Sequence, residues 1–223
     1  MIMSHDSIIK GIEEKIHIRV LTNEYEIISF FLDHEYLTAQ TLFNMSHASN
    51  TTFFKHLKTL EAKGVLHSQE NPDDKRIKIY SLTKMARNAT NIQNRRYVES
   101  YQNKFHIMDS RNNMFHSYGA NIRHDFQLDY TTCEYQILLF IYENSGMTNL
   151  QCGELLNVSP SKFNKTLKML LEMDLIYFRK DDADQRKKHY YLTDLASQTI
   201  RDGQEQMYQW LVANPALTSV DEG

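Results

Sequence analysis

A repeat within the chain constrains its fold more than any other sequence feature. Residues 22–83 align with residues 132–193 at an offset of 110 without a gap, and 18 of the 62 aligned pairs are identical. These pairs include Glu24/Glu134, Phe53/Phe163, Leu57/Leu167, Arg76/Arg186 and Leu82/Leu192. Identities at one fixed offset indicate a duplicated unit, because self-similarity at one spacing is the signature of a repeat architecture. The chain of 223 residues therefore predicts two copies of one small module, each with its own core.

Each copy begins with two predicted helices. Residues 24–33 and 134–143 are strongly apolar with polar ends, which is typical of a helix buried on most sides. A shorter helix follows Thr38 in the first copy and Thr148 in the second. Both threonines are well placed as N-caps, because a side-chain oxygen at this position accepts a hydrogen bond from a free amide of the first turn.

The third predicted helix of each copy is amphipathic. It begins after Ser49 and after Ser159, and Pro160 takes the favoured first-turn position in the second copy. Gly64 ends the first of these helices as a left-handed cap, and Asp174 takes its place in the second. The apolar positions recur at i, i+4 and i+7. They form the stripes Phe53, Leu57, Leu60 and Phe163, Leu167, Leu170.

A β-hairpin follows the third helix in each copy. The returning strand alternates apolar and polar residues in the first copy and is aromatic in the second. The strand, tip and returning strand are residues 65–68, 71–76 and 77–82 in the first copy and 175–178, 181–186 and 187–192 in the second. Three helices and a hairpin describe a winged helix, a variant of the helix-turn-helix whose third helix enters the DNA major groove.

The predicted fold class is mainly α with small β-hairpin wings, arranged as a tandem winged helix-turn-helix. Only 7 Gly and 3 Pro are present, too few for a turn-rich all-β fold. Residues 84–106 form a polar helix that joins the copies, and residues 194–211 are its counterpart. We expect a first module with its linker helix at 1–106, a second module at 107–211 and a disordered tail at 212–223.

Charge is distributed unevenly along the chain. The net charge is −3 and the isoelectric point is about 6.4, so composition as a whole does not indicate a nucleic-acid partner. Residues 49–83 carry six basic and four acidic groups, and residues 159–193 carry eight basic and five acidic groups. These segments are therefore +2 and +3, and the remainder is −8. Positive charge lies on the helix and hairpin that would face phosphates.

Composition also excludes several protein classes. The longest apolar run, residues 137–142, is far shorter than the roughly 20 residues that span a bilayer. The N-terminal sequence lacks the basic patch and apolar stretch of a signal peptide. Cys133 and Cys152 form neither a CxxC pair nor a disulfide framework, and ordinary packing is the favoured interpretation for both. We expect a cytoplasmic protein with no membrane partner.

The candidate DNA-contacting residues lie on the face of the third helix opposite the apolar stripe. Small hydroxyls and an amide near the helix start suit base edges and phosphates, lysines suit phosphate or guanine, and Asn164 suits adenine. On the third helices the candidates are Asn50, Thr51, Thr52, Lys55, Lys58, Ser161, Lys162, Asn164, Lys165 and Lys168. On the hairpins they are Arg76, Lys78, Arg186 and Lys188.

The hairpin tips carry the most specific motif. The sequences NPDDKRIKIYSLT and DDADQRKKHYYLT resemble the wing of the MarR/SarA family of bacterial transcription regulators, which runs Asp-Pro-x-Asp-x-Arg and then a strand ending Leu-Thr. The matching residues are Pro72, Asp74, Arg76, Leu82 and Thr83, and Asp181, Asp184, Arg186, Leu192 and Thr193. The resemblance implies that the Arg enters the minor groove and that the Asp fixes it by an ion pair, which suits the negative potential of a narrow groove.

The resemblance covers about residues 22–83 and 132–193, and it has departures. Asn71 replaces the usual acid, Asp182 replaces the proline, and Asp174 replaces the helix-ending glycine. Ordinary members carry one module per chain, so this chain is similar to the two-repeat SarA-like branch, which implies a single-chain pseudo-dimer. Its dimerisation-type layer would consist of residues 5–20, 84–120 and 194–211. The implied function is a sequence-specific regulator of transcription on double-stranded DNA, with a small-molecule effector and further self-association left open.

The sequence shows no motif of an enzyme. The ten histidines include no i, i+4 pair and no His-Glu-x-x-His, and there is no phosphate-binding Gly loop and no Gly-x-Ser-x-Gly. We expect no catalytic residue, no metal and no cofactor, and we expect His56 and His67 at the surface or beside DNA. Two alternatives stay open: a plasmid-type replication initiator with two winged helices, and a protein-interaction scaffold that binds no DNA.

Overall fold

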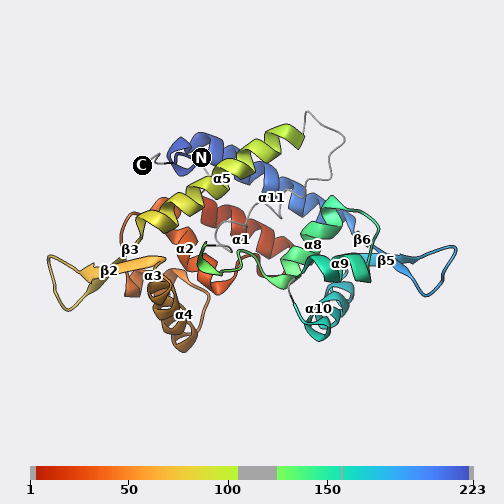
Figure 1. Cartoon of the computed structure of the whole chain (residues 1–223), viewed down its shortest axis with the longest axis horizontal. Coiled ribbons are helices and arrows are strands. Elements are labelled where there is room, and N and C mark those ends of the chain that lie inside the picture. The colour runs from red at the N-terminus through yellow and green to blue at the C-terminus, as the bar shows by residue number, and fades with distance from the viewer. Residues whose placement is uncertain (1–3, 105–124, 157, 221–223) are drawn as a thin grey trace. The chain divides into compact units, whose positions relative to one another are not determined.

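The same order of helices and strands occurs twice in the chain. The computed structural model describes residues 4–104, 125–156 and 158–220. The first module contains α2 (Asn23–Asp33), β1 (Leu37–Thr38), α3 (Ala39–Met45), α4 (Asn50–Ala62), β2 (Leu66–Glu70) and β3 (Lys78–Leu82). The second contains α8 (Cys133–Glu143), β4 (Met147–Thr148), α9 (Asn149–Leu155), α10 (Pro160–Glu172), β5 (Ile176–Lys180) and β6 (Lys188–Leu192). Every boundary recurs at an offset of 110, and each hairpin extends beyond the helices of its own module (Figure 1).

The caps predicted at Thr38, Thr148 and Ser159 are confirmed, whereas the side chain of Ser49 at the start of α4 makes no capping hydrogen bond. Thr38 accepts a hydrogen bond from the amide of Thr41, and Thr148 forms a capping box with Gln151. Ser159 accepts from the amide of Lys162, with Pro160 in the first turn. Local sequence thus sets where α3, α9 and α10 begin, because the caps satisfy amides that have no partner within the helix.

The apolar stripes of the third helices form the centre of each module. All six predicted stripe residues are buried, and Phe53, Leu60 and Leu170 are completely inaccessible to solvent. The apolar α2 and α8 are buried on most sides, as predicted. Each stripe therefore fixes which face of α4 or α10 points inward and leaves the opposite face exposed.

The two third helices end where the sequence predicted. Gly64 has a φ of 69° and Asp174 has a φ of 54°, so both adopt the left-handed conformation that ends a helix. The hydroxyl of Thr83 donates to the carbonyl of Gly64 (2.8 Å), and that of Thr193 donates to the carbonyl of Asp174 (3.0 Å). The last residue of the Leu-Thr motif thus attaches the end of the wing to the end of the third helix.

Each wing belongs to a three-stranded sheet, whereas the sequence predicted only a hairpin. The strand orders are β1-β3-β2 and β4-β6-β5, all antiparallel. Leu37 and Ser68 lie on opposite sides of Tyr80, and Met147 pairs with Tyr190. The additional strands contain two residues each, which is too short for a period-2 pattern to be recognised in sequence.

The chain divides into two compact units that exchange terminal segments. One unit comprises Met1–Ser7, Leu21–Tyr130 and Met207–Gly223, and the other comprises Ile8–Val20 and Thr131–Gln206. The repeat alone predicts a domain boundary between residues 106 and 107. In the structure, α1 (His5–Ile16) and α11 (Asp194–Ala213) are each divided between the units, whereas α5 (Lys84–Lys104) lies in the first. Residues 105–120 of the predicted linker and layer lie outside the described residues.

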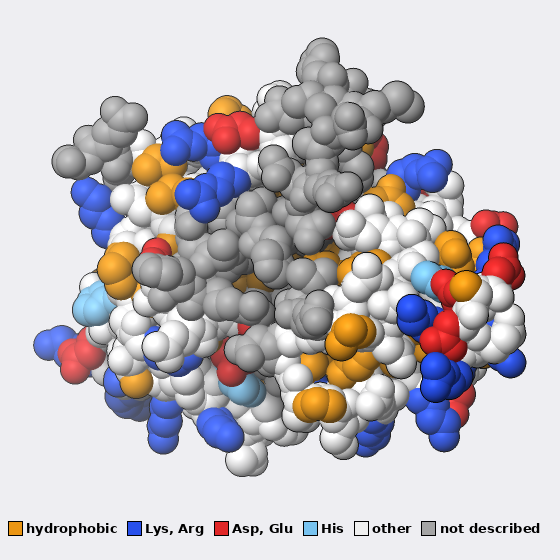
Figure 2. Space-filling view, turned by 45° about the vertical axis from the view of Figure 1, so that its right-hand side comes forward, with side chains coloured by type: hydrophobic (Ala, Val, Ile, Leu, Met, Phe, Trp, Pro, Cys, Tyr) orange, Lys and Arg blue, Asp and Glu red, His pale blue; other side chains and the backbone are white. Residues whose placement is uncertain are grey.

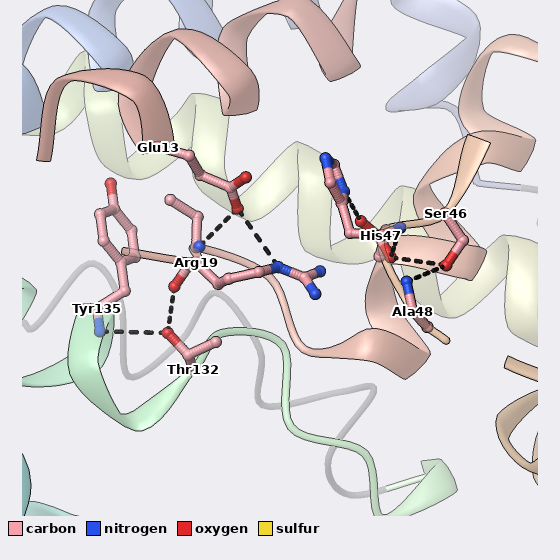
Figure 3. Close-up of polar contacts among 9 residues, drawn as sticks. Glu13, Arg19, Ser46, His47, Ala48, Thr132 and Tyr135 are labelled. Carbon is pink, nitrogen blue, oxygen red and sulfur yellow. Dashed lines mark hydrogen bonds and ion pairs between the residues drawn. The ribbon is translucent and has the colours of Figure 1, made fainter. Parts of the chain in front are cut away.

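Contacts within the second unit hold its N-terminal segment. The carboxylate of Glu13 accepts the amide of Val20 (2.7 Å) and lies 4.0 Å from Nε of Arg19 (Figure 3). The carbonyl of Arg19 accepts the hydroxyl of Thr132, which also caps α8 by accepting the amide of Tyr135 (3.3 Å). One threonine therefore joins residues 8–20 to the first helix of the second module.

The described chain continues past α11 to residue 220 and contacts α5. A short 3-10 helix (η1, Pro215–Leu217) follows α11. The amide side chain of Asn91 donates to the carbonyl of Ser219 (2.6 Å), and that of Asn94 donates to the carbonyl of Leu217 (3.1 Å). Asparagines of α5 in the first unit thus bind backbone groups of the tail, an interaction that its composition does not reveal.

Candidate nucleic-acid interface

The outward face of α4 carries the residues predicted from the first copy. Asn50, Thr51, Lys55 and Lys58 are exposed. Thr52 is half-buried, and its hydroxyl accepts a hydrogen bond from that of Ser49 (2.9 Å). Four of the five candidates are therefore accessible, while Thr52 has a local partner at the helix start.

The outward face of α10 carries the matching residues of the second copy. Ser161, Lys162, Asn164 and Lys165 are exposed. Lys168 is also exposed and lies 3.5 Å from the carboxylate of Glu172, one turn further along the helix. Such a solvent-exposed pair contributes little stability, so this lysine is available to a stronger anion.

Each wing tip presents one arginine whose guanidinium is oriented by an aspartate. In the first wing, Nε and Nη2 of Arg76 each lie 3.1 Å from one carboxylate oxygen of Asp74. In the second wing, Arg186 makes the same two contacts with Asp184 at 3.1 and 3.5 Å. The arginine side chains are nevertheless 90% and 92% exposed. The expected Asp–Arg pairs are thus present, and the bidentate geometry fixes the plane of each guanidinium.

These pairs change the protonation chemistry of the wing carboxylates. Hydrogen bonds from Arg76 lower the pKa of Asp74, and those from Arg186 lower the pKa of Asp184. Both aspartates therefore stay ionised and keep their arginines oriented over the physiological pH range.

The second wing contains a histidine contact that the first wing lacks. Nδ1 of His189 lies 2.8 Å from the carbonyl oxygen of Gly146, and Nε2 lies 2.9 Å from a carboxylate oxygen of Asp181. Both neighbours are acceptors, so both ring nitrogens must carry protons to satisfy them. The contact to Gly146 and the Asp181 pair raise the pKa of His189, and the histidine is the main cause that lowers the pKa of Asp181 to about 2.

Cationic side chains continue from the second wing tip along its strands. Lys188 is exposed, and its Nζ lies 4.1 Å from the centre of the Phe178 ring. The equivalent Lys78 of the first wing is exposed as well. In Figure 2 the wing of the second module, at the right, shows Lys and Arg interleaved with Asp and Glu. The predicted wing residues therefore form part of a charged, solvent-facing surface.

Two histidine–carboxylate pairs attach α4 and the turn before it to α2, and sequence reasoning missed both. Glu26 is buried, and its carboxylate accepts from Nδ1 of His47 (2.6 Å) and from the hydroxyl of Ser46 (3.2 Å), in the turn between α3 and α4 (Figure 3). Nδ1 of His56 lies 2.7 Å from the carboxylate of Glu24. His56 is thus half-buried against α2, while His67 is exposed. A Glu at i and i+2 of an apolar helix is the only sequence signal for these contacts.

The remaining candidate chemistry is structural. Cys133 and Cys152 are both buried and form no disulfide, and burial raises the pKa of Cys152 to about 11, which disfavours a reactive thiolate. Within the described ranges, no three His, Cys, Asp or Glu side chains gather as a metal site. Among the same residues, no helix combines the length and the apolar character needed to cross a bilayer.

Comparison with known proteins agrees with this geometry. Residues 134–177 match the family model described as winged helix-turn-helix DNA-binding. They cover α8, α9, α10 and the start of β5, and the first module repeats the same elements at an offset of 110. Both modules are winged helices. The fold class predicted from the sequence is therefore confirmed.

Comparison with solved structures finds transcription regulators that are similar to parts of this chain. The PcaV regulator of Streptomyces coelicolor matches with 21% identity over 41% of this chain and 65% of its own, with a TM-score of 0.34. MarR matches with 20% identity over 43% of this chain and 68% of its own, with a TM-score of 0.32. DNA-bound AbfR in its reduced form matches with 20% identity over 50% of this chain and 71% of its own, with a TM-score of 0.32. The match spans less than two thirds of the PcaV chain, and no curated protein sequence matches significantly.

Proposed function

We propose that the chain is a cytoplasmic, sequence-specific regulator of transcription that binds double-stranded DNA. In this proposal α4 and α10 enter major grooves and the two wings enter minor grooves. The observation that carries the proposal is the arginine at each wing tip, which is about nine-tenths exposed yet held in one plane by two contacts to an aspartate. An exposed, pre-oriented guanidinium is accessible to a nucleic acid and fits a narrow minor groove.

The residues of the third helices divide into two kinds under this proposal. Lys55 and Lys58 match Lys165 and Lys168 and suit the phosphate backbone that every duplex presents. Thr51 and Asn164 lie nearer the helix starts, where side chains reach base edges, and an amide such as that of Asn164 pairs with adenine. Lys78 and Lys188 add phosphate contacts from the wings.

Two modules in one chain imply a site with two half-sites. We propose a spacing of about 34 Å, one turn of the duplex, between the two third helices on DNA. The half-sites need not be identical, because Thr52 is replaced by Lys162 and Phe54 by Asn164. Binding of a small-molecule effector and further self-association stay predictions from the resemblance.

The test is selection of bound fragments from a random duplex library, followed by affinity measurement over a range of salt concentrations. Arg76→Ala and Arg186→Ala should each weaken specific binding by about 1–3 kcal/mol without unfolding the chain. Arg95→Ala is the matched control, because Arg95 is an exposed arginine of α5, outside the proposed interface, with a weak ion pair to Glu99. Each lysine removed from α4 or α10 should flatten the salt dependence by about one unit.

The same measurements separate the alternatives. A protein-interaction scaffold would select no duplex and show no steep salt dependence. A replication initiator would select arrays of repeated sites rather than one pseudo-palindrome. Unchanged footprints from the Arg76→Ala/Arg186→Ala double variant would remove the wings from the interface.

A further inference from the structure

One exposed residue of α4, the third helix of the first module, differs in chemistry from its neighbours. Phe54 is 39% exposed on α4, among side chains that are otherwise polar or cationic on that face. On a helix, Thr51 at i−3 and Lys58 at i+4 share its side, and both are exposed candidates for DNA contact. Phe54 therefore lies at the border of the proposed interface, between the buried stripe and the exposed face of α4.

A second aromatic ring holds Phe54 in place. The ring of Phe43, from α3, stacks on Phe54 with centroids 6.4 Å apart and an interplanar angle of 19°. The completely buried Phe53 lies edge-on to Phe54 at 5.2 Å. The cluster fixes the orientation of an exposed apolar ring before any ligand arrives, so little side-chain entropy is lost when the ring makes a contact.

The second module lacks both members of this stacked pair. Its residues at the positions of Phe43 and Phe54 are Gly153 and Asn164. A side-chain carbon built on Gly153 would meet none of the described atoms within 4 Å. The stacked aromatic pair is therefore a feature of the first module that the second module does not repeat.

We propose that Phe54, positioned by Phe43, makes the first module recognise the 5-methyl group of a thymine in the major groove. This inference rests on the proposed function. Thymine offers the one apolar group on the major-groove edges of the base pairs, and an apolar side chain is its natural partner. Asn164 offers hydrogen bonds instead, so the two half-sites differ at the equivalent position. Phe54 is then a specificity-determining residue, and Phe43 is a positioning residue.

The test replaces each thymine of the selected site, one at a time, by deoxyuridine. This change removes only the methyl group and leaves all hydrogen-bonding edges intact. Dissociation constants are measured by fluorescence anisotropy at one salt concentration, and the footprint of Arg76→Ala identifies the half-site of the first module. One deoxyuridine in that half-site should weaken wild-type binding by about fourfold, the transfer value of one buried methyl-sized group.

Two variants test whether the preference for thymine over deoxyuridine depends on Phe43 and Phe54. Phe54→Asn introduces the residue of the second module and should bind the thymine and deoxyuridine sites equally. Phe43→Gly should reduce the discrimination while leaving binding to unrelated duplex unchanged. Arg95→Ala, outside the proposed interface, is the matched control, and it should leave the deoxyuridine-sensitive position of the first half-site unaffected. Circular dichroism confirms that each variant is folded.

The possible outcomes separate this inference from the proposed function. Wild-type protein that binds no duplex overturns both. Specific binding with no thymine sensitive to loss of its methyl group overturns the role of Phe54 alone. If Phe54→Asn leaves the response to deoxyuridine unchanged, the role of Phe54 is also overturned. The same holds if Phe54→Asn changes only the oligomeric state of the protein.

Discussion

Adding one carbon atom to Gly64 should destabilise the protein, whereas adding it to Gly11 should stabilise it. A side-chain carbon built on either glycine meets nothing within 4 Å, so neither substitution creates a clash. The difference lies in the backbone. Gly64 ends α4 with a φ of 69°, while Gly11 lies inside α1. Comparison of Gly64→Ala with Gly11→Ala therefore isolates the conformational cost of the helix stop.

The expected magnitudes follow from the two backbone conformations. The left-handed region costs an L-residue roughly 1–2 kcal/mol, and alanine recovers about 0.4–1 kcal/mol because it restricts the unfolded chain. Gly64→Ala should therefore lower the free energy of unfolding by about 1 kcal/mol. Gly11→Ala should raise it by about 0.8–1 kcal/mol, the difference in helix propensity between the two residues. Asp174→Gly should have a small stabilising effect, since aspartate tolerates this region better than most residues.

Urea denaturation followed by circular dichroism gives these values from shifts of the midpoint at constant slope. The carbonyl of Gly64 accepts a hydrogen bond from Thr83 at the end of the wing. Gly64→Ala should therefore also displace the wing, and it should weaken DNA binding even under conditions where the variant is fully folded. Equal stability of Gly64→Ala and wild type would refute the argument that the left-handed stop determines where α4 ends.

Two further predictions concern the second unit. The pKa of His189 is raised above its ordinary value, so its stabilising contribution should be complete below pH about 6.5 and should disappear as the pH rises through the raised value. NMR titration of the ring checks this, with His189→Gln as the pH-independent control, and a ring that titrates at or below 6.5 would contradict it. Gly203→Ala should be less stable than helix propensity alone predicts, because the new carbon would overlap Cδ1 and Cγ1 of Ile12. Overpacking costs about 1–3 kcal/mol, and the helix propensity of alanine offsets about 1 kcal/mol of that loss. Ile12→Val should recover part of that loss in thermal denaturation, and additive effects of the two changes would rule out the contact.

Much of the fold is predictable because its signals are local. The caps at Thr38 and Ser159 and the stops at Gly64 and Asp174 depend on a few adjacent residues. The apolar stripe of α4 is likewise visible in the sequence, because its residues recur at the helical period. The third strand of each sheet was missed because two-residue strands carry no pattern, and their partner strand comes about 40 residues later in the chain.

The candidate site divides in the same way. Arg76 and its partner Asp74 are two residues apart, so the motif itself predicts their ion pair. By contrast, His47 and Glu26 are 21 residues apart, and no motif joins them. The stacking of Phe43 on Phe54 also depends on the angle between α3 and α4. Such contacts follow from packing, and sequence spacing does not indicate them.

The sequence by itself determined that one winged-helix module occurs twice, which face of its third helix is exposed, and which residues stand at the wing tips. These properties depend on periodicity, caps and turns, whose energies come from neighbours along the chain. Only the tertiary structure decided that Ile8–Val20 joins the second module and that Met207–Gly223 joins the first. An apolar helix face can be buried against any complementary surface, so its partner is selected by packing in three dimensions.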